Sequence, residues 1–210
     1  LPIPSLTALA RYYAVSAPDE LGAANLVTSV VVTYRGLDNL GEIAVLFLAA
    51  SGVGLLLRKR KTNKPEEKRR PASEILETGA AFLVPIIIMF GTSIFPQGHL
   101  TPGGGFQGGA VIASAILLVF LAVPDYRLAH GAVRASESLS GTAYIAIGLL
   151  GLVLAGGFLD SRFLPPGEFG TILSAGAIPV IYMLIGLKVG TELASILASL
   201  RGETEEEAVS

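Results

Sequence analysis

The sequence contains no cysteine, and only two histidines occur among its 210 residues. Without cysteine, the chain forms no disulfide, ligates no iron–sulfur cluster through thiolates and performs no thiol catalysis. Charged residues are also scarce, at 15% of the chain, against about 25% in a typical soluble domain. The formal net charge is only −2, so no general electrostatic signal points to nucleic acid. These absences exclude several common classes of enzyme and binding protein.

Apolar residues are abundant instead, at 51% of the chain, and they gather in long runs. A membrane-crossing helix needs about 20 such residues. The runs do not alternate between apolar and polar residues, as the strands of a transmembrane barrel would. We therefore predict an all-α fold, a polytopic transmembrane helix bundle with about five crossings, preceded by an apolar N-terminal segment from Leu1 to Tyr13. The predicted crossings are residues 40–57, 75–95, 105–123, 139–158 and 171–200.

Positive charge is concentrated in the loop between the first two crossings. Its basic residues are Arg58, Lys59, Arg60, Lys61, Lys64, Lys68, Arg69 and Arg70. Basic loops of membrane proteins remain in the cytoplasm, so we expect this loop and the C-terminus to be cytoplasmic in a cell-membrane protein. Alternation then places loops 96–104 and 160–170 outside and loop 124–137 inside. Binding of anionic lipid or RNA by the basic run is the less favoured interpretation.

The same basic stretch divides the chain into modules. Pro65 and Pro71 flank it, as in a linker, and Ser73 is a predicted helix N-cap. We predict a first module over residues 1–57, a basic linker over 58–72, a four-helix membrane module over 73–200 and an acidic tail over 201–210.

The most distinctive motif is a glycine-rich stretch at a predicted membrane boundary. It reads Gly98-His99-Leu100-Thr101-Pro102-Gly103-Gly104-Gly105-Phe106-Gln107-Gly108-Gly109. Glycine permits a tight turn into the next helix, and Gly105, Gly109 and Ala113 recur every four residues as a small face for packing another helix. A phosphate loop is not supported, since no Gly-Lys-Ser/Thr sequence follows. His99 has two interpretations that stay equal: proton handling, or a histidine bonded to loop carbonyls.

Ionisable residues inside a membrane helix are costly and point to function. Asp38 and Glu42 are four residues apart, so both carboxylates lie on one helix face, where they relay protons or ligate Na⁺. The alternative is that both lie in interfacial water, with Asp38 capping the helix. Glu77, one turn inside the second crossing, has the same two interpretations.

Lys188 and Glu192 lie four residues apart in the fifth crossing and are predicted to form an internal ion pair. The alternative is that both extend to water at the membrane surface. Gly186 and Gly190 flank Lys188, which favours close approach of a partner helix. We assign Asp38, Glu42, Glu77, Lys188 and Glu192 to a candidate ion pathway.

Two prolines fall within the predicted crossings. Pro85 and Pro179 are expected to interrupt the second and fifth helices, since each removes a backbone hydrogen bond. A plain kink is the favoured consequence, and a polar path lined by freed carbonyls is the alternative.

Two blocks of the sequence resemble a known family. Residues 25–57 centre on Arg35-Gly36-Leu37-Asp38-Asn39-Leu40-Gly41-Glu42-Ile43. They resemble the C-terminal segment of the large A subunit of Mrp-type sodium/proton antiporters, which is a separate E subunit in membrane-bound hydrogenases. Residues 74–193, with the glycine motif, resemble the B subunit of those antiporters, the MnhB domain. Together they cover about three quarters of the chain.

This resemblance implies a non-catalytic membrane subunit of a multi-subunit complex that translocates Na⁺ or H⁺, with Glu42 and Asp38 on the ion path. The implied partners are other small Mrp-type subunits and large antiporter-like subunits. Fusion of the two modules favours a redox-driven relative, such as a membrane-bound hydrogenase or sulfane sulfur reductase. Redox cofactors would then belong to hydrogenase-like and iron–sulfur partners, with no cofactor, metal or catalytic residue in this chain. The alternatives are a stand-alone Mrp secondary antiporter and a purely structural assembly subunit.

Overall fold

The computed structural model describes residues 7–57 and 71–201. Within these ranges the regular secondary structure is entirely helical and no strand is formed. The elements are α1 (Ala8–Leu21), α2 (Leu26–Thr28), the π-helical turn η1 (Ser29–Tyr34), α3 (Gly36–Leu57), α4 (Glu74–Gln97), α5 (Gly105–Ala122), α6 (His130–Ala155), the 3₁₀ turn η2 (Ser161–Phe163) and α7 (Ile178–Leu200). Five of these helices, α3 to α7, are long and apolar enough to cross a membrane, which confirms the predicted class.

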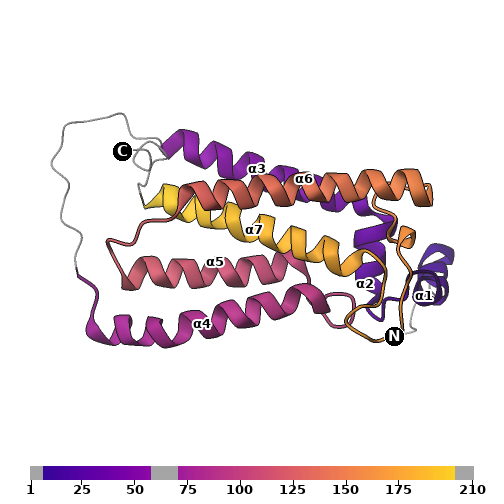
Figure 1. Ribbon diagram of the computed structural model, residues 1–210, viewed down its shortest axis with the longest axis horizontal. Coiled ribbons are helices and arrows are strands. Elements are labelled where there is room, and N and C mark those ends of the chain that lie inside the picture. The colour runs from indigo at the N-terminus through magenta and orange to yellow at the C-terminus, as the bar shows by residue number, and fades with distance from the viewer. Residues whose placement is uncertain (1–6, 58–70, 202–210) are drawn as a thin grey trace.

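The five long helices lie side by side and reverse direction at each step (Figure 1). We call the end where α3 finishes and α4 begins the linker end. The opposite end, where residues 98–104 join α4 to α5, is the glycine-loop end. Helix α7 occupies the centre, because it packs against each of the other four, and its inward side chains form much of the buried core.

The predicted start of the fourth crossing is wrong. Helix α6 begins at His130 rather than near residue 139, and it ends at Ala155 rather than at residue 158. Much of the predicted inside loop 124–137 is therefore helical. Hydropathy does not reveal this part of the helix, because its residues are polar. A helix extends beyond the apolar part of a crossing wherever its backbone hydrogen bonds are satisfied.

The predicted start of the fifth crossing is also wrong. Residues 171–177 form a loop in which Ala175 and Gly176 have φ angles of 65° and 58°, a region that a right-handed helix does not use. Helix α7 begins after them, so Pro179 lies in its first turn, where a missing N–H breaks no helical bond. Pro179 does not interrupt the helix, whereas Pro85 does lie inside α4.

Small residues bring α5 against α7, as the spacing of Gly105 and Gly109 predicts. A Cβ atom placed on Gly105 would lie 2.6 Å from the Ile185 Cβ, and one on Gly109 would lie 2.8 Å from the Gly186 carbonyl oxygen. Neither position has room for a side chain. Gly186 and Gly190 lie against α4 and α5 of this same chain, in the close helix approach that these glycines favour.

The N-terminal module holds the glycine-rich loop in place. The Asn25 side chain donates to the carbonyl oxygens of Gly98 and Thr101, each at 3.0 Å. The Thr28 hydroxyl donates to the same Gly98 oxygen at 2.7 Å and lies 2.9 Å from the Tyr182 hydroxyl on α7. These contacts join segments that are far apart in the sequence into one structural unit.

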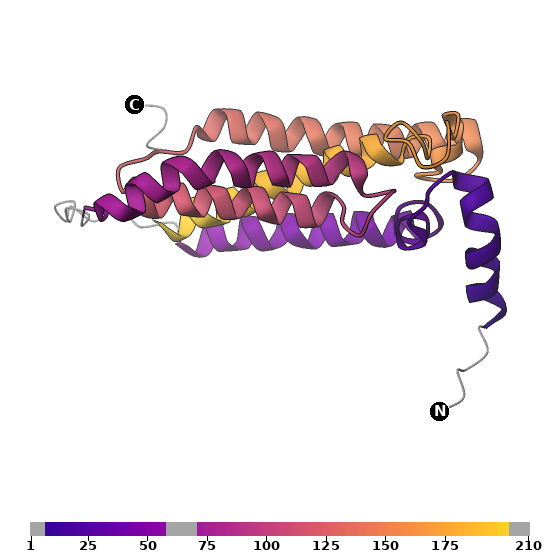
Figure 2. The same cartoon turned by 90° about the horizontal axis from the view of Figure 1, so that it is seen from below.

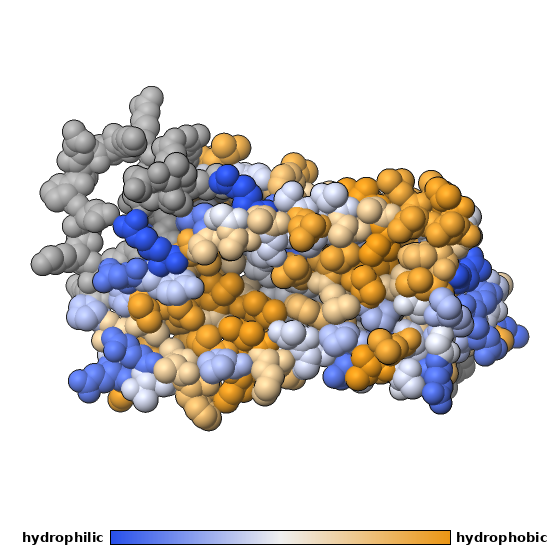
Figure 3. Space-filling model, viewed as in Figure 1, coloured by the Kyte–Doolittle hydropathy of each residue, from blue (hydrophilic) through white to orange (hydrophobic). Residues whose placement is uncertain are grey.

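Helix α1 stands across the long axis of the bundle at the glycine-loop end (Figure 2). It contains the described part of the predicted apolar N-terminal segment, and it is not one of the five candidate spans. Hydrophilic side chains gather at the two ends of the bundle, and apolar ones cover much of the face between them (Figure 3). Leu48, Phe82 and Val153 are examples of large exposed apolar side chains on α3, α4 and α6. This pattern suits a protein surrounded by lipid or other apolar helices.

The Ser73 side chain accepts a bond from the Leu76 N–H at 3.3 Å and caps α4, as predicted. The basic residues of the predicted linker and the acidic residues of the tail lie outside the described ranges, as do Leu1 to Leu6.

Candidate functional site

A cluster of three charged side chains lies between α6 and α7. The Lys188 Nζ donates to Glu192 Oε1 at 2.5 Å and to Glu137 Oε1 at 3.4 Å. The same ammonium lies 5.1 Å from the centre of the Phe47 ring on α3, where a cation is attracted to the aromatic face. One lysine is therefore shared between two carboxylates and covered by an aromatic ring.

The cluster is largely shielded from solvent within the chain. Glu192 is fully buried, and the side chains of Lys188 and Glu137 are 12% and 22% exposed. With all three groups ionised, the net charge is −1. Glu192 Oε2 has no hydrogen-bond partner among the described residues, although a buried carboxylate oxygen normally has one. The arrangement can therefore accept one more positive charge.

The sequence predicts the Lys188–Glu192 pair, but it does not single out Glu137. Glu137 lies 51 residues before Lys188 and falls in a predicted loop, so no short-range spacing connects the two. A signal is present nonetheless, because Glu137, Gly141, Tyr144 and Gly148 follow the spacing of one helix face. A prediction of one long helix from residue 130 would have placed these four residues on a shared face.

The structure does not bring Asp38 and Glu42 to this cluster. Both lie near the glycine-loop end of α3 and are exposed on the surface of the chain. Asp38 pairs with Arg35, three residues earlier, and lies inside the first turn of α3. The two acids follow the predicted spacing on one face, but no ion-pathway role is tested by that placement.

Glu77 and His99 lie at opposite ends of the bundle. Glu77 is exposed in the first turn of α4, at the linker end. His99 is fully buried at the glycine-loop end, and its Nε2 lies 3.0 Å from the Thr171 carbonyl oxygen. The contact fits the interpretation of a histidine bonded to a loop carbonyl, while proton handling stays a prediction.

The glycine motif forms the predicted tight turn between α4 and α5. Its predicted members are Pro102, Gly103, Gly104, Gly105, Gly108 and Gly109. Gly104 ends the turn against Tyr182, where a Cβ would lie 2.8 Å from the ring. The motif thus shapes the glycine-loop end and the α5–α7 contact.

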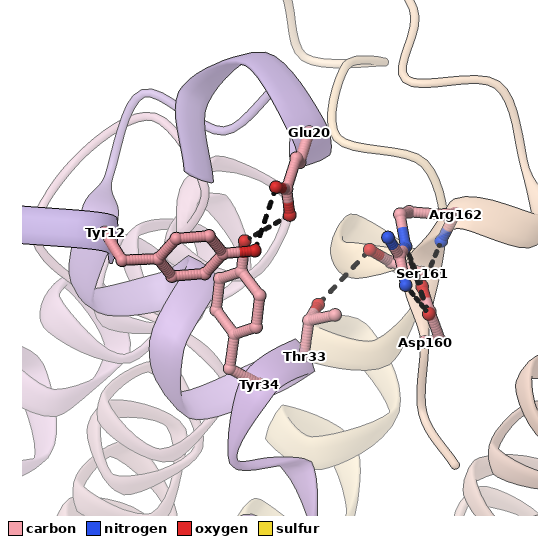
Figure 4. A network of polar contacts seen from close by, with 7 residues as sticks. All are labelled: Tyr12, Glu20, Thr33, Tyr34, Asp160, Ser161 and Arg162. Carbon is pink, nitrogen blue, oxygen red and sulfur yellow. Dashed lines mark hydrogen bonds and ion pairs between the residues drawn. The ribbon is translucent and has the colours of Figure 1, made fainter. Parts of the chain in front are cut away.

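A second set of polar contacts links α1 to η1, and η1 to the loop before α7, where the Thr33 and Ser161 hydroxyls lie 3.2 Å apart (Figure 4). The Tyr34 and Tyr12 hydroxyls donate to the two oxygens of Glu20, at 2.7 Å and 3.0 Å. Arg162 binds Asp160 through its Nη2 at 2.5 Å and its Nε at 2.9 Å. A small cavity lies between these groups, with Glu20 and Arg162 among the residues that line it.

Both carboxyl groups of this network remain ionised at neutral pH. The hydrogen bonds from Tyr34 and Tyr12 lower the pKa of Glu20. Burial raises the pKa of Asp160, but the bonds from Arg162 outweigh it and the net pKa is lowered. Because neither carboxyl group changes its charge near neutral pH, its hydrogen bonds and ion pairs persist over the physiological range. We therefore interpret these contacts as the attachment of α1 to the bundle.

The described residues contain no group of three or more histidine, cysteine, aspartate or glutamate side chains placed to hold a metal ion. The charged chemistry inside the crossings is concentrated in the Glu137–Lys188–Glu192 cluster.

Comparison with known proteins gives two family matches that meet at residue 75. Residues 75–195 match the family described as a domain related to the MnhB subunit of Na⁺/H⁺ antiporters. Residues 1–75 match the family described as the E subunit of MBH. An uncharacterized protein of Methanocaldococcus jannaschii is 31% identical over 204 residues, which cover 83% of this chain and 77% of that protein.

Two solved structures share the fold. One comes from the membrane-bound sulfane sulfur reductase, an archaeal respiratory membrane complex, with a TM-score of 0.84, 43% identity, and coverage of 95% of this chain and 88% of that chain. The other comes from the Mrp complex of Dietzia sp. DQ12-45-1b, with a TM-score of 0.74, 26% identity and coverage of 93% of this chain. In the Mrp complex the similarity spans only 23% of the matched chain.

Proposed function

This chain belongs to the family of domains related to the MnhB subunit of Na⁺/H⁺ antiporters, and from that premise we propose that it is a non-catalytic membrane subunit of a cation-translocating complex. The complex contains several membrane subunits, as the Mrp and sulfane sulfur reductase complexes do. The greater identity to the sulfane sulfur reductase chain favours a complex driven by redox chemistry. Iron–sulfur or hydrogenase-like partners would then hold the redox cofactors, and Na⁺ or H⁺ is the transported ion.

The observation that carries this proposal is the buried Glu137–Lys188–Glu192 cluster. Ionisable groups within membrane helices are costly and, by default, mark ion or proton pathways. A purely structural helix contact gains little from such groups, because apolar packing of the same volume is as stable or more stable. A cluster that holds two carboxylates for one ammonium suits a site where a passing positive charge is accepted and released.

The remaining predicted pathway residues are proposed to act at the ends of the route. Glu42 and Asp38 lie toward the glycine-loop end of α3, and Glu77 lies at the linker end of α4. Their exposed positions allow contact with adjoining subunits. There, an acid at the entrance of the path would bind the ion as it enters or leaves. His99 is a candidate proton-handling group near the same end as Glu42.

The proposed orientation places the linker end in the cytoplasm. The positive-inside rule assigns the basic residues between α3 and α4 to that side. The antiparallel order of α3 to α7 then places the C-terminal end of α7 on the same side and the glycine-loop end outside. The chain would thus lie in the cytoplasmic membrane, with α1 and the glycine-rich loop at its outer surface.

Purification of the tagged full-length chain in mild detergent tests the subunit assignment. We expect large antiporter-like subunits and other small Mrp-type subunits to co-purify, together with iron–sulfur subunits if the complex is redox-driven. Recovery of antiporter subunits alone would instead favour a secondary antiporter. Recovery of the chain by itself, from membranes where the partners are expressed, would contradict the proposal.

A further inference from the structure

The Glu137–Lys188–Glu192 cluster holds a lysine where a permanent ion pair would suit arginine better. Lys188 is the only lysine in the described ranges 7–57 and 71–201. An arginine guanidinium offers a planar fork of donors to carboxylates and stays charged, which makes it the usual cation of a buried ion pair. A lysine ammonium is a compact point charge that can give up its proton when it is buried. The residue type therefore points to proton transfer.

The three side chains of the cluster form a line of decreasing exposure. The side chain of Glu137 is 22% exposed, that of Lys188 is 12% exposed, and that of Glu192 is fully buried. The Lys188 Nζ lies between the two acids, 3.4 Å from Glu137 Oε1 and 2.5 Å from Glu192 Oε1. Because one nitrogen is within hydrogen-bonding reach of both carboxylates, it can connect the accessible acid to the buried one.

Gly141 on α6 makes room for the end of the lysine stem. Gly141 follows Glu137 by one helical turn. A Cβ placed on Gly141 would lie 3.3 Å from the Lys188 Cε and 3.9 Å from its Nζ. The missing side chain lets the stem lie against the α6 backbone, so that an ammonium from α7 reaches Glu137. A small displacement of Nζ is then enough to exchange its closer carboxylate partner.

Glu192 has one oxygen that the ion pair does not use. Its Oε1 accepts from Lys188, whereas its buried Oε2 has no hydrogen-bond partner among the described residues. An ionised carboxylate is costly to bury unless its oxygens are paired. A proton added to Glu192 removes that charge. The buried acid is therefore suited to hold a proton that arrives through Lys188.

The charged groups of the neighbouring helices lie nearer the surface. Helix α3 places the Phe47 ring over the ammonium, and helix α5 contains no ionisable residue. On α4, Glu74 and Glu77 are exposed in the first turn at the linker end. On α6, Arg134 precedes Glu137 by three residues and is exposed.

We propose that Lys188 carries a proton between Glu137 and Glu192, and that the ion handled at this cluster is H⁺. This inference rests on the proposed function and specifies its ion. Carboxylates and amines give and take protons. A sodium ion instead needs several oxygen ligands around one point, and the point between these two carboxylates is occupied by an ammonium.

The proposed transfer conserves protons at every step. A proton that reaches Glu137 from the linker end neutralises that carboxylate. The Lys188 ammonium gives a proton to Glu192 and becomes a neutral amine, and the amine then takes the proton from Glu137. The intermediate carries no charge, which suits a buried site. Glu137 and Lys188 are now in their starting forms, and release of the added proton from Glu192 to a water molecule resets the cluster.

The test is Lys188→Arg in the assembled complex, purified with its partners and reconstituted into vesicles. Arginine keeps the positive charge between the two carboxylates but does not give up its proton. An imposed sodium gradient drives transport, and a pH-sensitive dye reports proton movement per assembled complex. We expect assembly to persist, the maximal rate to fall at least about tenfold, and the half-saturating sodium concentration to stay unchanged. Lys64→Arg, the same exchange between α3 and α4 in the sequence, is the matched control and should keep the wild-type rate.

The outcomes separate this inference from the proposed function. A Lys188→Arg complex that moves protons at the wild-type rate would overturn transfer through Lys188, because a fixed positive charge would then be sufficient. The proposed function would still stand if Glu192→Gln stopped transport, and it would fail as well if Glu192→Gln transported normally. A raised half-saturating sodium concentration in Lys188→Arg would overturn the assignment of H⁺, since the cluster would then bind Na⁺.

Infrared difference spectroscopy decides the question if Lys188→Arg does not assemble. Spectra of the wild-type complex at high and low pH are compared in the region where a protonated carboxyl group absorbs. We expect a band that Glu192→Gln abolishes and that Glu74→Gln, a change at an exposed acid of α4, leaves in place. A spectrum from which Glu192→Gln removes no band would overturn proton uptake by Glu192.

Discussion

Lys188→Met is expected to reduce transport by the assembled complex to less than about a tenth of the wild-type rate. Methionine fills much of the space of the lysine stem but leaves Glu192 buried without its ion-pair partner. Breaking a buried pair from one side costs about 3–5 kcal/mol, so the yield of assembled complex should also fall. Transport and yield both fall because a single ammonium group is paired with two carboxylates. Transport and yield are measured on the same membranes.

Two companion variants separate the structural effect from the functional one. Lys188→Met combined with Glu192→Gln removes both charges of the closest pair, so we expect assembly to recover while transport remains lost. Lys188→Arg keeps a positive charge beside Glu137 and Glu192, so we expect assembly to persist. A Lys188→Met complex that assembles and transports at the wild-type rate would show that the cluster is not part of the ion path.

Gly109→Leu is expected to lower the stability of the chain strongly. Atoms of the α7 backbone lie 2.8 Å and 2.9 Å from the position of a Gly109 Cβ, at the Gly186 carbonyl oxygen and the Gly190 nitrogen. Backbone atoms of a packed helix cannot turn aside as a flexible side chain does, so α5 must move away from the centre of the bundle. Overpacking typically costs about 1–3 kcal/mol and sometimes more, and we expect the upper end of that range.

Gly79→Leu is the matched control for this prediction. Gly79 lies in a membrane helix of the same chain, and a Cβ placed on it would meet no atom of a neighbouring element within 4 Å. Leucine there should leave stability unchanged or improve it slightly, because leucine favours helix more than glycine does. The measurement is the thermal stability of the purified chain in detergent. Equal stability of the two leucine variants would contradict the α5–α7 packing described above.

Hydropathy and charge were sufficient to predict the number of crossings, and glycine spacing was sufficient to predict the α5 packing face. Both signals are local, since a crossing needs an apolar run and a close helix contact needs small residues four apart. The two wrong helix starts arose where these signals do not apply. The polar first turns of α6 are helical although they are hydrophilic. Residues 171–177 are partly apolar, yet the positive φ angles at Ala175 and Gly176 end any helix there.

The candidate site was predicted only in part for a related reason. Lys188 and Glu192 are one helical turn apart, so sequence spacing alone brings them together. Glu137 joins them only because α6 packs antiparallel to α7. Contacts of this kind depend on which helices are neighbours, and a single sequence does not specify that.

Sodium-dependent proton movement by the reconstituted complex, compared between wild type, Glu42→Gln and Glu192→Gln, tests the central claim most directly. Both variants keep the size of the side chain and remove its charge. Glu74→Gln is the control, because Glu74 is exposed at the linker end of α4. An ion path that includes Glu42 and Glu192 predicts strong loss of transport in both test variants, with assembly and the control unchanged. Wild-type transport by both test variants would contradict the path and leave the chain with a structural role alone.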